Sequence, residues 1–188
     1  AELRQASPNL GRPPRKPPYM IHLLCVSDVR AVKLYLPAKQ AELDAMLDCL
    51  EVDSWQEVQL EECDTAMPEM WAFVDMAHTS MEQVNQFAQC LEILDANGEL
   101  AAFKAVAGQL DIYKLEDAMA LTEHLSEYAF EPSIHSLEDR AREELALMAD
   151  GPELDLLIRN LNLTAYGADL MYRDRGILSD YGYVHRPD

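Results

Sequence analysis

Hydrophobic and polar positions in the first third of the chain predict two strands, a helix and a third strand. Residues 21–26 (IHLLCV) and 30–36 (RAVKLYL) are mostly apolar and are separated by turn residues around Ser27–Asp28. In residues 38–50 (AKQAELDAMLDCL), apolar side chains recur at helical spacing. Residues 55–62 follow as a third strand with one largely charged side. The pattern predicts a small ββαβ unit whose sheet has one solvated face.

The middle of the chain has the period of amphipathic helices. Thr79 or Ser80 is suited to cap a helix over residues 81–94, whose apolar side chains fall on one face. After a break at NGE, residues 99–110 and 115–125 predict two more helices. Because short helices are marginal in water, we expect these three to pack on one another.

The last third predicts further helices and a closing β-structure. Ser136 is suited to cap the helix in SLEDRAREELALM, which ends before Asp150, and PELDLLIRNLNL (152–163) adds one or two more helical turns. Residues 164–184 are rich in Tyr and Gly, and there we expect a turn followed by a hairpin or strand.

Together these elements predict an α+β protein of three small modules. Residues 1–19 contain five prolines and are expected to form a flexible basic tail. The expected modules are an α/β unit over residues 20–74, a helical unit over 75–128 and an α+β unit over 129–188.

Charge narrows the classes of function. The formal net charge is −19, and residues 20–188 alone hold 33 acidic against 11 basic residues. Between Lys39 and Lys104 there are fifteen Asp and Glu and no basic residue. Six of the fourteen residues in EVDSWQEVQLEECD (51–64) are carboxylates. A charge of this size repels nucleic acid and anionic membranes, which argues against direct binding to either.

Apolar segments and cysteines indicate a cytoplasmic protein. No apolar run approaches the roughly 18–20 residues that a membrane span needs, and the stretch before Met20 lacks the apolar region of a secretory signal. Cys25, Cys49, Cys63 and Cys90 form no CxxC pair and mostly have apolar neighbours, which is typical of reduced, buried thiols.

The sequence contains none of the common catalytic or cofactor templates. Gly-rich nucleotide loops, GxSxG and HExxH are missing, and DANGE at 95–99 lacks the remaining ligands of an EF-hand. We therefore expect no catalytic residues, no metal and no cofactor. A small hydrolase whose Cys and His meet only in space stays open as an alternative.

Long stretches of one sign of charge suggest a use for the field that they create. Pairs of opposite charge at positions i and i+4 of a helix would each add a few tenths of a kcal/mol to its stability, and long stretches of this chain lack them. About 22 negative charges match those of about 37 Å of DNA duplex, at one charge per ~1.7 Å. The pattern permits mimicry of DNA, and it equally permits a halotolerant or chaperone-like acidic protein.

The C-terminal sequence LTAYGADLMYRDRGILSDYGYV resembles the end of the ArdA-type antirestriction proteins. In that family an aromatic-Gly-x-Asp-Leu element is followed by a Gly and a closing aromatic strand. The matching residues here are Ala165, Tyr166, Gly167, Asp169, Leu170, Gly176, Tyr181, Gly182 and Tyr183. TSMEQVNQFAQCLEIL resembles the start of a helix in the family, and SLEDRAREEL lies where the family has another acidic helix. Ala168 and Leu163–Thr164 depart from the family's usual residues.

The resemblance implies an elongated chain of three small domains that dimerises through the C-terminal one. Such proteins are encoded on mobile genetic elements. Their acidic surface mimics bent DNA and occupies the DNA-binding groove of Type I restriction–modification enzymes, which it blocks stoichiometrically. An inhibitor of another nucleic-acid-binding complex, such as a CRISPR effector, would share the charge pattern.

The hypothesis names two sets of residues. The acids expected to contact the partner are Glu57, Glu61, Glu62, Glu92, Glu99, Asp111, Glu116, Asp117, Glu123, Glu127, Glu138, Asp139, Glu143 and Glu144. The residues expected to pack a domain or a dimer seam are Tyr166, Gly167, Tyr181, Gly182 and Tyr183.

Overall fold

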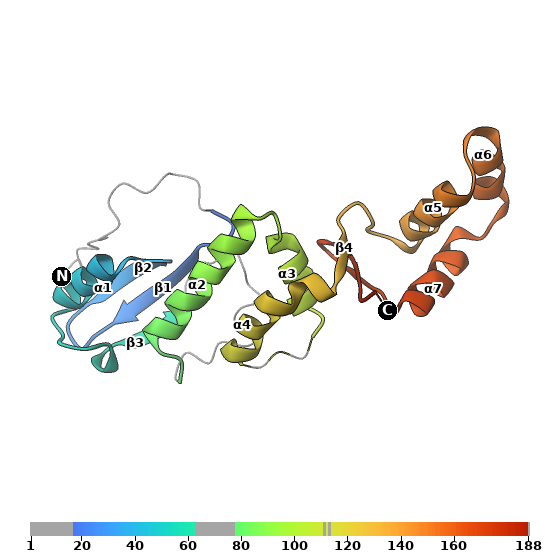
Figure 1. Cartoon of the computed structure of the whole chain (residues 1–188). Helices are drawn as coiled ribbons and strands as arrows, with labels where there is room; N and C mark the ends of the chain where they lie inside the picture. Colours follow the sequence, from blue (N-terminus) through green and yellow to red (C-terminus); the bar gives the residue numbers. More distant parts are fainter. Residues whose placement is uncertain (1–16, 63–77, 111, 113, 188) are drawn as a thin grey trace. The chain divides into compact units, whose positions relative to one another are not determined.

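The chain is an α+β protein, as its sequence predicts (Figure 1). The computed structural model describes residues 17–62, 78–110, 112 and 114–187, so most of the predicted tail lies outside the described residues. In this part of the chain there are seven α-helices and two three-stranded antiparallel sheets. The elongated arrangement of three modules stays a prediction.

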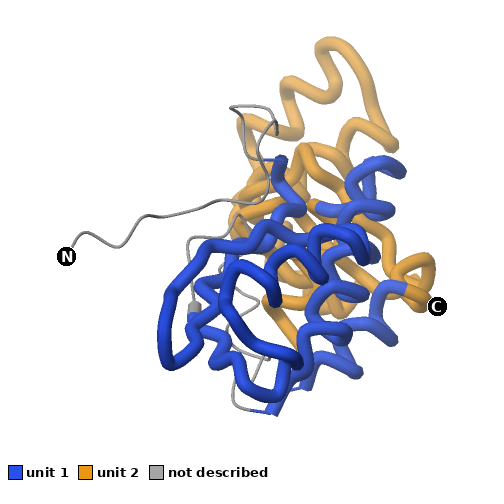
Figure 2. Tube along the Cα trace, turned by 90° about the vertical axis from the view of Figure 1, so that its left-hand side faces the viewer, with its two compact units in different colours: residues 1–100, 112–122 blue, residues 101–111, 123–188 orange. Residues whose placement is uncertain are grey.

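Two compact units make up the described chain (Figure 2). Unit 1 comprises the described residues up to Leu100 together with Ile112–Thr122. Unit 2 comprises residues 101–110 and 123–187. Each unit has its own sheet and its own buried side chains, and each is described by itself.

The sheet of unit 1 has the predicted ββαβ topology. Strands β1 (Ile21–Val26), β2 (Ala31–Leu36) and β3 (Gln59–Glu62) lie in the order β2-β1-β3. β1 pairs with β2 so that Ile21 is opposite Leu36. Alternate side chains of both strands are fully or almost fully buried, since one face of this sheet forms the core of the unit.

The third strand is shorter than predicted. Trp55–Glu57 form a 3₁₀-helix, and β3 begins only at Gln59. Local hydrogen bonds explain the difference, because the Glu57 carboxylate accepts the backbone N–H groups of Asp53 and Ser54 at 3.1 Å each. These two bonds hold the segment in a tight turn that alternation of side chains does not reveal.

Three helices complete unit 1: α1 (Gln40–Leu50), α2 (Met81–Ala96) and most of α4 (Leu115–His124). Ser80 caps α2 as predicted, since its Oγ accepts the backbone N–H of Gln83 at 3.2 Å. Both α1 and α2 pack against β2. The buried faces of the three helices have the apolar spacing read from the sequence.

A buried amide connects α2 to the sheet. Asn85, in α2, accepts the backbone N–H of Ala38 at 2.8 Å and donates to the Ala38 carbonyl at 3.0 Å. The side chain thus replaces the backbone partner that Ala38 would otherwise lack between β2 and α1. This pair fixes the position of α2 along the sheet.

The sheet of unit 2 is built from residues far apart in sequence. β4 (Ala129–Glu131) pairs with β6 (Gly182–His185), which pairs in turn with β5 (Ile177–Ser179). β5 and β6 form the hairpin that the C-terminal sequence predicts. α3 (Leu100–Ala107) contributes the fully buried Phe103.

Three further helices follow β4: α5 (Leu137–Met148), α6 (Gly151–Asn160) and α7 (Leu163–Asp174). Ser136 caps α5 as predicted, because its Oγ accepts the Asp139 N–H at 3.1 Å. The expected turn after residue 164 is wrong, since this segment is the helix α7. Its packing against α5 outweighs the weak helix preference of its glycine and aromatic residues.

None of the helices in the described part of the chain combines the length and the apolar character that a bilayer span requires.

Candidate acidic interaction surface

Unit 1 carries a large excess of negative charge. Its described residues include fifteen Asp and Glu but only four bases, which are Arg30, Lys33, Lys39 and Lys114. Between two described residues of this unit, the only ion pair joins Arg30 to Glu51 at 2.5 Å. The surface therefore stays strongly negative.

Several predicted contact acids of unit 1 have partners, but these partners are neutral. Glu57 accepts backbone N–H groups, and Glu116 accepts the side-chain amide of Gln83 at 3.1 Å. Glu61 and Glu99 each accept a side-chain amide at 3.4 Å. Hydrogen bonds of this kind orient a carboxylate without cancelling its charge, so these acids remain available to an external cation.

Two other predicted acids of unit 1 are exposed and make no hydrogen bond or ion pair within the described chain. Glu92 lies near the end of α2, and Asp117 lies in the first turn of α4. Glu62 belongs to β3 by its backbone, opposite Leu23, and Asp111 lies outside the described residues.

The ends of the helices in unit 1 add to the accumulation of negative charge. α1 has Asp48 in its last turns, and α2 has Glu92 and Asp95, whereas neither last turn contains a base. Carboxylates near the negative end of a helix dipole are unfavourable for helix stability.

A groove of about 600 Å³ lies beside Glu92, between the start of α1 and α2, and Lys39, Glu42 and Gln89 also line it.

Unit 2 differs because four of its acids, Glu127, Asp139, Glu144 and Asp174, form ion pairs with cations of the same unit. Glu127 pairs with Arg186 and contacts His124 Nδ1 at 2.9 Å. Glu144 pairs with Arg140 at 3.1 Å. Of the predicted acids here, Glu123 and Glu143 are exposed and lack a partner in the described chain.

Glu138 and Asp139 serve the local structure of α5. Glu138 accepts the hydroxyl of Thr164 in α7, and this hydrogen bond lowers the pKa of the Glu138 carboxyl. The Ser136 side chain and the backbone N–H of His135 lower the pKa of Asp139. Glu138 therefore connects α5 to α7, and Asp139 stabilises the start of α5.

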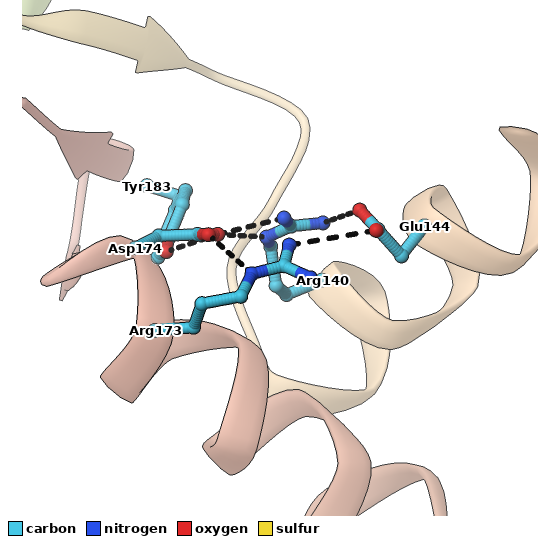
Figure 3. Close-up of polar contacts among 5 residues, drawn as sticks. All are labelled: Arg140, Glu144, Arg173, Asp174 and Tyr183. Atoms are coloured by element: carbon cyan, nitrogen blue, oxygen red, sulfur yellow. Dashed lines mark hydrogen bonds and ion pairs between the residues drawn. The ribbon is translucent and has the colours of Figure 1, made fainter. Parts of the chain in front are cut away.

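Arg140 is the centre of a polar cluster that joins α5, α7 and β6 (Figure 3). Its guanidinium donates to Asp174 Oδ2 at 2.7 Å and 3.1 Å and to Glu144 Oε2 at 3.1 Å. Arg173 donates to the same two carboxylates at 3.1 Å and 3.4 Å. The hydroxyl of Tyr183 lies 3.3 Å from Asp174 Oδ2. The cluster holds two helices and the hairpin together.

Charges in this cluster shift the pKa values of its members. Burial alone would lower the pKa of Arg140, but its hydrogen bonds to Asp174 and Glu144 outweigh burial and raise it. Burial would raise the pKa of Asp174, and the two arginines reverse the effect and lower it. Burial raises the pKa of Tyr183. The shifts of Arg140 and Asp174 favour their ion-paired, charged forms, and the shift of Tyr183 favours its neutral hydroxyl.

The glycines of the C-terminal element permit close packing. A Cβ on Gly167 would lie 1.9 Å from the Leu137 carbonyl oxygen, and one on Gly176 would lie 1.9 Å from the Tyr183 hydroxyl. Gly182 has a φ of +142° and lies against the backbone of Glu131. These close approaches need glycine, because any side chain would collide with backbone or with a buried ring.

The three tyrosines named from the sequence have different environments within unit 2. Tyr183 is fully buried, whereas Tyr166 and Tyr181 are half-buried. The Lys104 ammonium lies 5.8 Å from the centre of the Tyr181 ring. Tyr183 therefore acts inside the unit. The sequence did not single out Arg140, Arg173 or Asp174, because the contacts that join α5 to α7, Arg140–Asp174 and Arg173–Glu144, span about thirty residues.

The described residues contain no group of three or more His, Cys, Asp and Glu that could hold a metal ion. Cys25 is buried, Cys49 and Cys90 are half-buried, and Cys63 lies outside the described residues. None of these three described cysteines forms a disulfide.

A comparison with models of protein families found no match for the chain, and a search among curated proteins found no relative.

Proposed function

We propose that this protein is a cytoplasmic antirestriction protein of the ArdA type that acts without catalysis. Its acidic surface would mimic DNA and occupy the DNA-binding groove of a Type I restriction–modification enzyme. It would act as a homodimer. The resemblance of the C-terminal sequence supplies the family, and the structure of unit 1 supplies the physical argument.

The observation that carries the proposal is the set of exposed carboxylates in unit 1 that have no cation partner among the described residues. Fifteen acids against four bases leave about 11 net negative charges, as many as about 19 Å of duplex at one charge per ~1.7 Å. Neutral amides and N–H groups hold Glu57 and Glu116, while Glu92 and Asp117 are open to solvent. A protein that needed only solubility would gain stability by mixing the two signs of charge.

A cationic groove would recognise this surface by two effects. The field of the inhibitor attracts Lys and Arg at long range, which raises the rate of encounter. Contact then replaces the counterions of both surfaces, so binding should weaken with salt. The groove beside Glu92 is large enough to receive a cationic side chain from the partner.

The decisive experiment is capture of a Type I methyltransferase core by this protein, with and without competing duplex DNA. The proposal expects a stoichiometric complex that duplex DNA displaces. If the protein instead captured a CRISPR effector from a panel of DNA-binding complexes, that effector and not a restriction enzyme would be its target. Failure to bind any DNA-binding complex would refute mimicry of DNA.

Graded neutralisation tests the distributed mechanism. We expect Glu92→Gln, Asp117→Asn or Glu61→Gln alone to weaken inhibition by less than about fivefold, since exposed charge pairs contribute about 0.2–1 kcal/mol. The triple variant should lose about tenfold, which corresponds to ~1.4 kcal/mol. The matched control neutralises Asp150, Asp169 and Asp180, three exposed acids of unit 2, and should lose much less. Complete loss of activity from one conservative substitution would point to an enzyme or a metal site.

A further inference from the structure

Helix α6 presents an outer face that nothing in the described chain covers. None of its ten residues is buried, although Leu154, Leu157 and Ile158 are half-buried on the side that meets α5. A helix of this length is marginal in water and depends on tertiary packing. Contact with a further surface would therefore stabilise it.

Exposed apolar side chains lie at the end of α5, in the middle of α6 and just after the end of α6. Leu147 is 83% exposed, Met148 62%, Leu156 64% and Leu161 42%. Together, four side chains of this size expose on the order of 400 Å² of apolar surface. That is about half of the ~800 Å² that each partner contributes to a standard interface.

The charges on the outer face of α6 are arranged symmetrically about Leu156. Pro152, Glu153, Leu156, Arg159 and Asn160 occupy positions i−4, i−3, i, i+3 and i+4, and all five are exposed. Within the described chain, neither Glu153 nor Arg159 forms a hydrogen bond or an ion pair.

We propose that α6 pairs antiparallel with α6 of a second copy of the chain, about a two-fold axis at Leu156. The two-fold axis would place Leu156 of one chain against Leu156 of the other. Arg159 would lie opposite Glu153 of the other chain, and the same pair would form twice. A surface that complements itself in this way is what a two-fold interface requires.

A second copy fits this face better than a foreign partner does. A foreign protein gains nothing from charges arranged symmetrically about one leucine. Elsewhere the strongly negative surface of unit 1 makes two copies repel each other. Tyr183 is buried inside unit 2 and cannot reach a second chain. The inference rests on the homodimer contained in the proposed function and locates its interface.

The test is sedimentation equilibrium of the full chain, without any target enzyme. We expect a dimer, and we expect Glu153→Arg and Arg159→Glu to weaken dimerisation at least about tenfold each, because each places like charges opposite one another twice. Mixing the two variants should restore a dimer, since each Arg then faces a Glu across the heterodimer. The matched control Asp180→Arg, on the hairpin turn of the same unit, should dimerise as the unmodified chain does.

Three results would overturn the inference: a monomeric unmodified chain, single variants that dimerise normally, or a mixture that stays monomeric. Circular dichroism of each variant separates loss of dimer from loss of fold. Because target binding is measured separately, a monomer that still captures the methyltransferase core would refute the interface alone. A normal dimer that captures no DNA-binding complex would refute only the inhibitor function.

Discussion

Substitution of Arg140 by Met should destabilise unit 2 strongly. The Arg140 side chain is 12% exposed and that of Asp174 is 14% exposed, so the pair is nearly buried. Removing one partner of a buried ion pair costs about 3–5 kcal/mol, because the other charge is left behind. Arg173 still contacts both carboxylates, which reduces the expected loss to roughly 2–3 kcal/mol.

Thermal unfolding followed by circular dichroism measures this loss. In a unit of this size, 1 kcal/mol shifts the melting temperature by about 4–8 °C, so a decrease of roughly 10–20 °C is expected. The matched control is Arg142→Met on the same helix. Arg142 is 52% exposed and lies 3.9 Å from Asp139, and an exposed pair contributes less than about 1 kcal/mol.

The effect should also depend on pH. The pKa of Asp174 is lowered in the folded protein from its ordinary value of 3.8. The stability that the ion pair contributes is therefore complete above the unfolded pKa and is lost as the pH falls through the folded pKa. The difference between the unmodified chain and Arg140→Met should begin to shrink as the pH falls below about 5 and should be lost once the pH is below the lowered pKa of Asp174. Equal effects of the Arg140 and Arg142 substitutions, or a difference that does not change with pH, would refute this reasoning.

Two further substitutions test the packing of the two units. Asn85→Ala should destabilise unit 1 by about 2–4 kcal/mol in urea unfolding, because it removes the side chain that bonds the buried N–H and C=O of Ala38. The control Gln89→Ala, on the exposed face of α2, should change the free energy of unfolding by less than about 0.5 kcal/mol. Gly167→Ala should destabilise unit 2 by about 1–3 kcal/mol or more, because the new Cβ would lie 1.9 Å from the Leu137 carbonyl oxygen. Unfolding of the Gly167 variant at the same urea concentration as the unmodified chain would show that α5 and α7 separate freely.

Local sequence determined most of the secondary structure. The strands over 21–26 and 31–36 and the caps at Ser80 and Ser136 follow from side-chain alternation and from hydroxyl groups that accept nearby N–H groups. Such interactions join residues only a few positions apart. A sequence pattern can therefore predict them without knowledge of the fold.

Two predicted elements were wrong where another interaction outweighed the pattern. At Trp55–Glu57 a carboxylate that accepts two backbone N–H groups replaces the start of a strand. In residues 163–174 the sequence looks unfavourable for a helix, but Gly167 lets α7 approach the backbone of α5 closely.

The total charge of the surface was determined by composition, whereas its distribution was decided by the tertiary structure. Counting Asp and Glu shows a strongly negative chain, but it does not show which carboxylates have a cation beside them. Folding brings Arg140 and Asp174 together across 34 positions of the sequence, and it leaves Glu92 and Asp117 without such a partner in the part of the chain that the structure describes. Electrostatic neutralisation depends on distance in space, so it becomes visible only once the chain is folded.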